Sequence, residues 1–173
     1  MKYTGFLSLA CVLVLSFTQY ASGVDIVVRS NAFKNGQRIP RAHTCDGADI
    51  SPALAWSFVG SARSFAVTCT DPDAPVGVFI HWIAYNIPAH AKGLDEGFAR
   101  NAPPFKTLQG NNDFGRAGYN GPCPPKGKPH RYYFTVYALD IAVNETGLSY
   151  QGLMARIKGH VLAQGQLMGL YGR

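Results

Sequence analysis

The chain of 173 residues carries a formal net charge of +6, and 47% of its residues are hydrophobic while 15% are charged. A chain of this length fits one domain with a real core. The 16 Lys and Arg residues are scattered along the sequence, so we expect no nucleic-acid partner and only a mild attraction to anionic ligands or lipid surfaces.

The first 23 residues have the features of an export signal. Lys2 supplies a positive charge, residues 6–17 form an apolar run too short to span a bilayer, and Ala21-Ser22-Gly23 offers small residues for cleavage. The alternative is a buried N-terminal helix. We expect residues 1–23 to be a signal peptide and residues 24–173 to form a single domain, periplasmic or secreted, with no transmembrane segment in the mature chain.

The mature region predicts more strands than helices. Runs of β-branched and aromatic residues predict strands at 25–29, 64–70, 79–87 and 132–139, and an alternating pattern predicts a last strand at 160–171. Residues 153–158 are the only helix candidate. Segments 40–56 and 91–129 are rich in turn residues, and a long irregular stretch such as the second is usually functional in a compact domain.

Three cysteines remain after the expected cleavage. Cys69 lies inside an apolar run and is expected to be a buried thiol. Cys45 and Cys123 both lie in loop-like sequence, so we expect them to form a disulfide in an oxidising compartment. A zinc site is the rival interpretation, but no CxxC or HxxxH spacing favours it.

Polar side chains lie at the ends of the predicted strands. Asp71 and Asp73 occupy the tight turn after strand 64–70, and His81 lies near the start of strand 79–87. A loop stiffened by four prolines leads to His130 and Tyr132, which share one side of their strand because side chains alternate. These positions indicate a pocket for a small ligand. The alternatives are a proline-rich turn that caps a hairpin, and a histidine at position 81 that only fills the core.

Five motifs in this order resemble the phosphatidylethanolamine-binding protein family, and more closely its bacterial branch of Raf-kinase-inhibitor-like proteins. They are TCDGADISPALAW (44–56), DPDAP (71–75), HW (81–82), GPCPPKGKPHRYYFTVYALD (121–140) and HVLAQGQLMGLYGR (160–173). The resemblance implies a mainly β fold, in which a large antiparallel sheet packs on a smaller sheet with few short helices. It also implies a cis-proline at position 75.

The resemblance further implies a small pocket for phosphate-like anions or phospholipid headgroups, with no cofactor, no metal and no catalytic residue. Carried over residue by residue, the ligand-binding set is Asp71, Asp73, His81, Gly121, Pro122, His130 and Tyr132. Imidazole, phenol and backbone N–H groups are the donors that an anion needs. Asp71 is expected to orient a histidine, and Asp73 to face a cationic amine.

The function expected from these residues is that of an exported ligand-binding protein that modulates or inhibits a partner protein. One alternative is a hydrolase of the phosphoesterase or peptidase type that uses the Asp, His and Tyr side chains, although no GxSxG motif accompanies them. A second is a metal site formed by Asp71, His81 and His130. A third is an inhibitor that contacts a protease or kinase through its surface loops.

Overall fold

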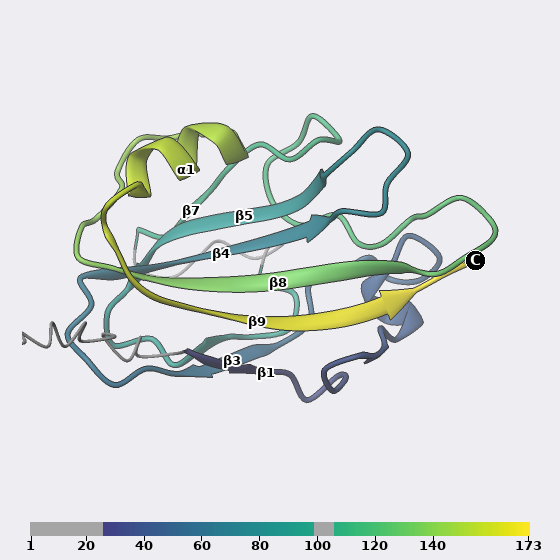
Figure 1. Cartoon of the computed structure of the whole chain (residues 1–173), viewed down its shortest axis with the longest axis horizontal. Coiled ribbons are helices and arrows are strands. Elements are labelled where there is room, and N and C mark those ends of the chain that lie inside the picture. Colours follow the sequence, from purple (N-terminus) through teal and green to yellow (C-terminus); the bar gives the residue numbers. More distant parts are fainter. Residues whose placement is uncertain (1–25, 99–105) are drawn as a thin grey trace, which may run out of the picture.

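Six strands form the larger of two sheets in the computed structural model, which describes residues 26–98 and 106–173 (Figure 1). Their spatial order is β2-β9-β8-β4-β5-β7. The bounds are β2 Gln37–Arg38, β4 Ser64–Asp71, β5 Phe79–Pro88, β7 Leu108–Gln109, β8 His130–Leu139 and β9 Val161–Tyr171. All neighbours are antiparallel except β2 and β9, which run parallel. The expected signal peptide, residues 1–23, lies outside the described residues.

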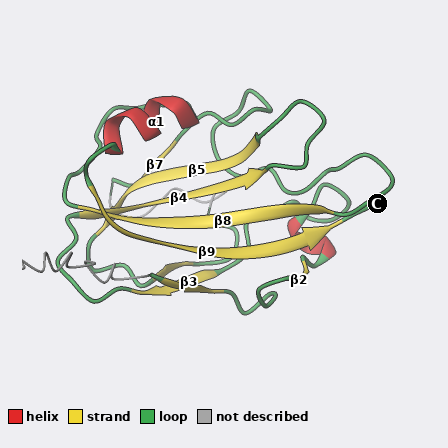
Figure 2. Cartoon of the chain, viewed as in Figure 1, coloured by secondary structure: helices red, strands yellow, loops and turns green. Residues whose placement is uncertain are grey.

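The smaller sheet has three short strands, in the order β1-β3-β6, and it lies against one face of the large sheet (Figures 1 and 2). They are β1 Val27–Arg29, β3 Leu54–Ser57 and β6 Gly93–Leu94. The helix α1, Tyr150–Ile157, covers the opposite face of the large sheet, and a 3-10 turn, η1, spans Arg41–His43. This arrangement confirms the mainly β fold with two sheets and few short helices.

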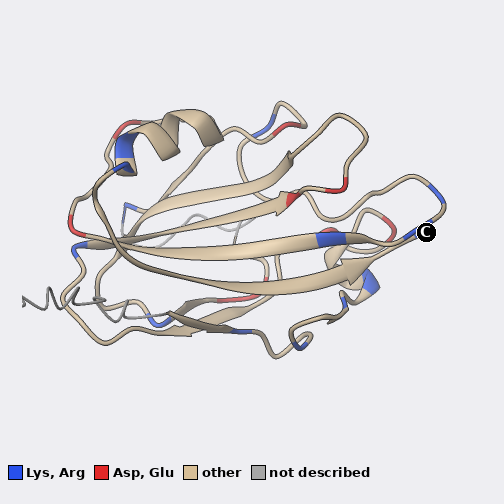
Figure 3. Cartoon of the chain, in the orientation of Figure 1, with Lys and Arg blue, Asp and Glu red and all other residues tan. Residues whose placement is uncertain are grey.

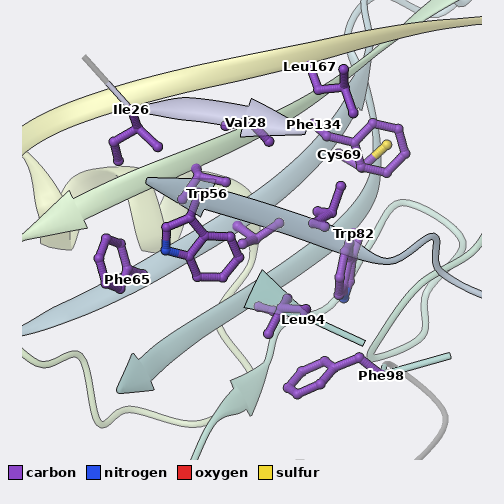
Figure 4. Packing of buried hydrophobic residues seen from close by; sticks show 14 of the residues in the cluster. Ile26, Val28, Trp56, Phe65, Cys69, Trp82, Leu94, Phe98, Phe134 and Leu167 are labelled. Atoms are coloured by element: carbon purple, nitrogen blue, oxygen red, sulfur yellow. The ribbon is translucent and has the colours of Figure 1, made fainter. Parts of the chain in front are cut away.

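Two hydrophobic clusters hold these layers together. The larger one lies between the sheets and includes Trp56, Phe65 and Phe134 (Figure 4). The smaller one packs Leu153 and Ile157 of α1 on the other face of the large sheet. The central strands are therefore buried on both faces, which explains why β4, β5 and β8 are long apolar runs without clear alternation.

The helix α1 begins three residues before the predicted start at residue 153. The hydroxyl of Ser149 accepts a hydrogen bond from the Gly152 N–H and so caps the first turn. No helix in the described part of the chain is long and apolar enough to cross a membrane.

Four strand ends meet at one edge of the large sheet. The register pairs Asp71 at the end of β4 with Phe79 at the start of β5, and His130 at the start of β8 with Tyr171 at the end of β9. In Figure 1 this is the end that carries the C terminus and the loops before β5 and β8. Side chains from strands that are distant in sequence are therefore brought together here.

Candidate functional site

A cavity of about 180 Å³ opens at this edge of the sheet. Its polar lining includes four residues of the predicted set, and these come from three neighbouring strands. The full lining is Asp71, Ala74, Pro75, Val76, Phe79, His81, Phe114, Cys123, Pro124, Pro125, His130 and Tyr132. The volume is below the ~300–1,000 Å³ of typical drug-sized ligand pockets, so it suits a headgroup-sized ligand.

His81 reaches the cavity because it is the extra residue of a β-bulge. Cys69 of β4 pairs with Trp82, whereas the next residue, Thr70, pairs with Ile80. His81 therefore has no partner residue on β4, and a bulge of this kind changes the direction in which a side chain points. The strand predicted at 79–87 does not reveal this irregularity.

His81 is held as a neutral imidazole. Its Nδ1 lies 2.8 Å from the carbonyl oxygen of Asn120, so Nδ1 carries the proton and donates it to that oxygen. Burial lowers the pKa of His81 below its ordinary value, although the Asn120 carbonyl opposes this shift. In this tautomer Nε2 is a hydrogen-bond acceptor, which differs from the donor role expected from the sequence.

His130 and Asp71 form a buried pair across β8 and β4. Nδ1 of His130 donates to Oδ2 of Asp71 at 2.8 Å, and both side chains are almost fully buried. The carboxylate fixes the ring orientation and leaves Nε2 of His130 as the ring nitrogen available to a ligand. Asp71 thus has the orienting position that we expected for it.

The hydroxyl of Tyr132 makes no hydrogen bond of good geometry with the described part of the protein, although the residue is fully buried and the Asp71 side chain lies close enough to interact with it. Burial, and then the negative charge of Asp71, raise the pKa of Tyr132, so the phenol is a neutral donor. A buried hydroxyl without a partner costs about 1–3 kcal/mol. Such a group beside a cavity is available to a ligand.

Aromatic rings form much of the apolar wall. Phe79 and Phe114 pack edge to face with centroids 4.9 Å apart, and His81 lies 5.3–5.4 Å from both rings. Phe114 is held in place by Asn112, whose Oδ1 accepts the N–H of Phe114. The ligand-binding set predicted from the sequence did not include the two phenylalanine rings, or Pro124 and Pro125. Pro124 and Pro125 lie inside the motif at 121–140 and Phe79 lies close to the motif at 81–82, whereas Phe114 lies outside all five motifs and had no signal.

The loop before β8 is fastened to the segment that follows η1. Cys45 and Cys123 form a disulfide, the pair expected from the sequence, and Cys69 is a buried free thiol. Two hydrogen bonds lie beside the disulfide: the Cys45 N–H donates to the Pro122 carbonyl at 3.1 Å, and the Gly121 N–H donates to Oδ1 of Asp49 at 2.7 Å. The proline-rich wall is therefore fixed before any ligand arrives.

Two residues of the predicted set, Gly121 and Pro122, support the cavity without lining it. The Gly121 amide is engaged by Asp49 and so does not serve as a ligand donor. Only glycine fits at this position, because a Cβ there would lie 2.2 Å from the carbonyl oxygen of His43. The two residues bring the loop and the neighbouring segment into close contact.

Asp73 lies away from the cavity, on the other side of β8. Its carboxylate accepts hydrogen bonds from Nη2 and Nε of Arg131, at 2.6 and 2.9 Å, and from the Arg131 N–H. The Arg131 hydrogen bonds lower the pKa of Asp73 to about 2. Asp73 therefore already has a guanidinium partner, and its role toward a ligand amine stays a prediction.

Two other expectations concern backbone geometry and metal ligands. The peptide bond before Pro75 is trans, so the expected cis-proline is not observed. Within residues 26–98 and 106–173, no three His, Cys, Asp or Glu side chains are grouped closely enough to hold a metal ion.

Comparisons with known proteins identify similar chains in bacteria. The sequence model of the family described as phosphatidylethanolamine-binding protein matches residues 29–172. A UPF0098 protein of Aquifex aeolicus is 43% identical over 166 residues, covering 93% of this chain and 97% of the relative. The UPF0098 protein YbhB of Escherichia coli is 40% identical over 153 residues, covering 82% of this chain and 97% of YbhB.

Solved structures agree with these sequence matches. A Chlamydia trachomatis protein, described as a phosphatidylethanolamine-binding protein homolog, superimposes with a TM-score of 0.79 and 38% identity, covering 86% of this chain and 98% of its own. Escherichia coli YbcL, described as a new member of the mammalian family, gives a TM-score of 0.79 at 36% identity, covering 86% of this chain and 99% of YbcL.

Proposed function

Since the chain belongs to the phosphatidylethanolamine-binding protein family, we propose that its cavity binds the phosphate group of a small molecule or of a phospholipid headgroup. The protein is then a binding protein rather than an enzyme. The observation that carries this proposal is the hydroxyl of Tyr132, a buried donor without a well-aligned hydrogen-bond acceptor among the described residues, beside a cavity of about 180 Å³.

The charges around the cavity limit which ligands it can bind. Asp71 is negative and lies in the lining, so an anion binds best when His130 is protonated and the imidazolium offsets the carboxylate. Nε2 of the protonated His130 and the Tyr132 hydroxyl then donate to the phosphate oxygens. This arrangement favours a single phosphate group over a polyphosphate.

The neutral His81 adds a second requirement. Its Nε2 accepts a hydrogen bond, so the preferred ligand carries a donor next to its phosphate oxygens. A protonated phosphate oxygen or the ammonium of phosphoethanolamine meets this requirement. The aromatic wall formed by Phe79 and Phe114 provides apolar contacts for the carbon atoms of the same ligand.

Calorimetry with phosphoethanolamine and with inorganic phosphate tests the proposal. His130→Ala should weaken binding about tenfold or more, because a charge-assisted hydrogen bond contributes roughly 1.5–3 kcal/mol. The matched control is His160→Ala, which removes an exposed pair of the same chemistry, with Nδ1 of His160 2.8 Å from Oδ1 of Asp140. Equal affinities in the wild type and His130→Ala would show that the ligand binds elsewhere.

Hydrolysis is the competing function. The cavity offers no serine, and its one cysteine, Cys123, is in the disulfide. Phosphoesterase and peptidase assays, each with and without a divalent metal, should therefore show no turnover that depends on His130. If the wild type shows turnover and His130→Ala abolishes it, the function is catalysis and not binding.

We also propose that the protein is exported, and that it modulates or inhibits a partner protein once there. Mature protein isolated from its host should begin after Gly23, and N-terminal sequencing checks this. A protein that begins at Met1 would contradict export. Affinity capture from the mature protein's own compartment, with and without phosphoethanolamine, checks the partner.

A further inference from the structure

A second cavity, of about 530 Å³, lies at the same end of the molecule and is lined by three arginines. Figure 3 shows Lys and Arg positions on several segments around the C terminus. The lining residues are Arg38, Arg41, Asp46, Gly127, Pro129, Tyr171, Gly172 and Arg173. None of the predicted ligand-binding residues belongs to this arginine cavity.

The single acidic side chain that lines the arginine cavity is already engaged. Oδ2 of Asp46 accepts the hydroxyl proton of Tyr171 at 2.7 Å, and Oδ1 lies 3.3 Å from Nε of Arg173. Within the described residues, neither Arg38 nor Arg41 has a carboxylate oxygen within 4.0 Å. Two guanidinium charges therefore remain without an anionic partner beside the cavity.

Both unpaired guanidinium groups are held in place by backbone oxygens. Nη2 of Arg38 donates to the Gly172 carbonyl at 3.2 Å, and the guanidinium lies over the Tyr171 ring at 5.1 Å. Nε of Arg41 donates to the Asp46 carbonyl. Each guanidinium group keeps further N–H donors for a ligand. Because the two side chains are already held in place, binding a ligand costs little of their conformational entropy.

We propose that the arginine cavity is a second binding site, for a phosphate monoester. The two guanidinium groups without a carboxylate partner, those of Arg38 and Arg41, match the two charges of a dianion, and arginine N–H groups match tetrahedral oxyanions by paired hydrogen bonds. The volume, about 530 Å³ against about 180 Å³ for the first cavity, leaves room for the organic part of the ester. Because this site involves neither His130 nor Tyr132, it stands or falls independently of the first.

The two cavities share a wall. Cys123 and His130 line the first cavity, and Gly127 and Pro129, which lie between them in sequence, line the arginine cavity. Nη1 of Arg173 also approaches Sγ of Cys123 at 3.8 Å. NMR signals of the backbone amides in this segment are therefore sensitive to ligand binding in either cavity, and the amides that shift show which cavity is occupied.

The test is a titration of the full chain with glycerol 3-phosphate, followed by ¹H–¹⁵N NMR at fixed ionic strength. The Gly127 and Gly172 amides should shift and saturate in the wild type. The double variant Arg38→Gln/Arg41→Gln should bind at least about tenfold more weakly at these amides, since two charged donors are lost. The control Arg29→Gln/Arg63→Gln removes the same charge elsewhere and should stay within about twofold of the wild type.

Two results would overturn the proposal. Affinity at Gly127 and Gly172 that stays within about twofold in the Arg38→Gln/Arg41→Gln variant would show that the arginines do not bind the ligand. An equal loss in the control variant would show that net charge alone attracts it.

Further probes identify the source and class of the ester. Dimethyl phosphate, a monoanionic diester, should bind about tenfold more weakly than glycerol 3-phosphate, and equal binding would refute the monoester assignment. Vesicles of phosphatidylcholine with phosphatidate present the same monoester on a lipid. If the wild type co-sediments with these vesicles and the Arg38→Gln/Arg41→Gln variant does not, the arginine cavity binds the phosphate monoester of a lipid. If the wild type binds glycerol 3-phosphate but does not co-sediment, the arginine cavity binds a soluble ester.

Discussion

Replacing Tyr132 with phenylalanine should stabilise the ligand-free protein and weaken ligand binding at the same time. The wild-type hydroxyl is buried without a hydrogen bond, which costs about 1–3 kcal/mol. The nearby charge of Asp71 recovers part of that cost, so we expect the free energy of unfolding to rise by about 1 kcal/mol in Tyr132→Phe. Most substitutions of buried residues do the opposite.

The same substitution removes a donor that the ligand would use. The hydroxyl is already desolvated in the free protein, so its hydrogen bond to a phosphate oxygen contributes near the upper end of the usual ~0.5–1.5 kcal/mol. Affinity for phosphoethanolamine should therefore fall up to about tenfold. Urea unfolding measures the first effect, and calorimetry measures the second.

Tyr85→Phe is the matched control for both measurements. Tyr85 is also fully buried, but its hydroxyl donates to the Glu145 carbonyl at 2.7 Å, and it packs in the cluster beneath α1. This variant should lose about 1 kcal/mol of stability and keep its affinity. If Tyr132→Phe instead destabilised the protein as Tyr85→Phe does, the wild-type hydroxyl would have a partner and the reasoning about the cavity would be refuted.

Three further outcomes are expected. Replacing Cys45 and Cys123 with serine should lower the free energy of unfolding by about 4 kcal/mol, since the bridge closes a span of 78 residues, and unchanged urea unfolding would contradict this. Asp73→Asn should lower the free energy of unfolding by less than ~1 kcal/mol, because Arg131 is half exposed. Calorimetry should find the affinity for phosphoethanolamine unaltered in this variant. A tenfold loss of affinity would place Asp73 in the binding site. Burial lowers the pKa of His81, so as the pH falls the unfolded chain is protonated at His81 before the folded chain is. The contribution of His81 to the free energy of unfolding is therefore complete above about pH 6.5. It is lost, by at most ~1.4 kcal/mol per pH unit, as the pH falls toward the pKa of His81 in the folded protein. His81→Gln should flatten that acid dependence in urea titrations, and an unchanged slope would assign it to other groups.

The long strands were predictable because burial on both faces demands continuous apolar sequence. The strands predicted at 64–70, 79–87, 132–139 and 160–171 differ from β4, β5, β8 and β9 by at most two residues at an end. The strands β3, β6 and β7 have two to four residues each, and their hydrogen bonds depend on partners that are distant in sequence. Local propensity carries little information at that length.

The candidate site was predictable in its residues but only partly in its geometry. The separation of Tyr132 from Arg131 by strand alternation follows directly from the sequence, and the structure shows one buried and the other exposed. The bulge at His81 does not follow from the sequence, because it arises from the pairing of β5 with β4. The position of Asp73 was also hidden, because Asp73 lies in the turn after β4, where strand alternation no longer sets the direction of a side chain.

The fastening of Cys123 and Gly121 to the neighbouring segment has a consequence for the speed of recognition. A wall held by a disulfide and by hydrogen bonds does not have to rearrange when a ligand enters. Association should then approach the rate at which ligand and cavity meet by diffusion, and differences in affinity among related ligands should appear mainly as differences in residence time.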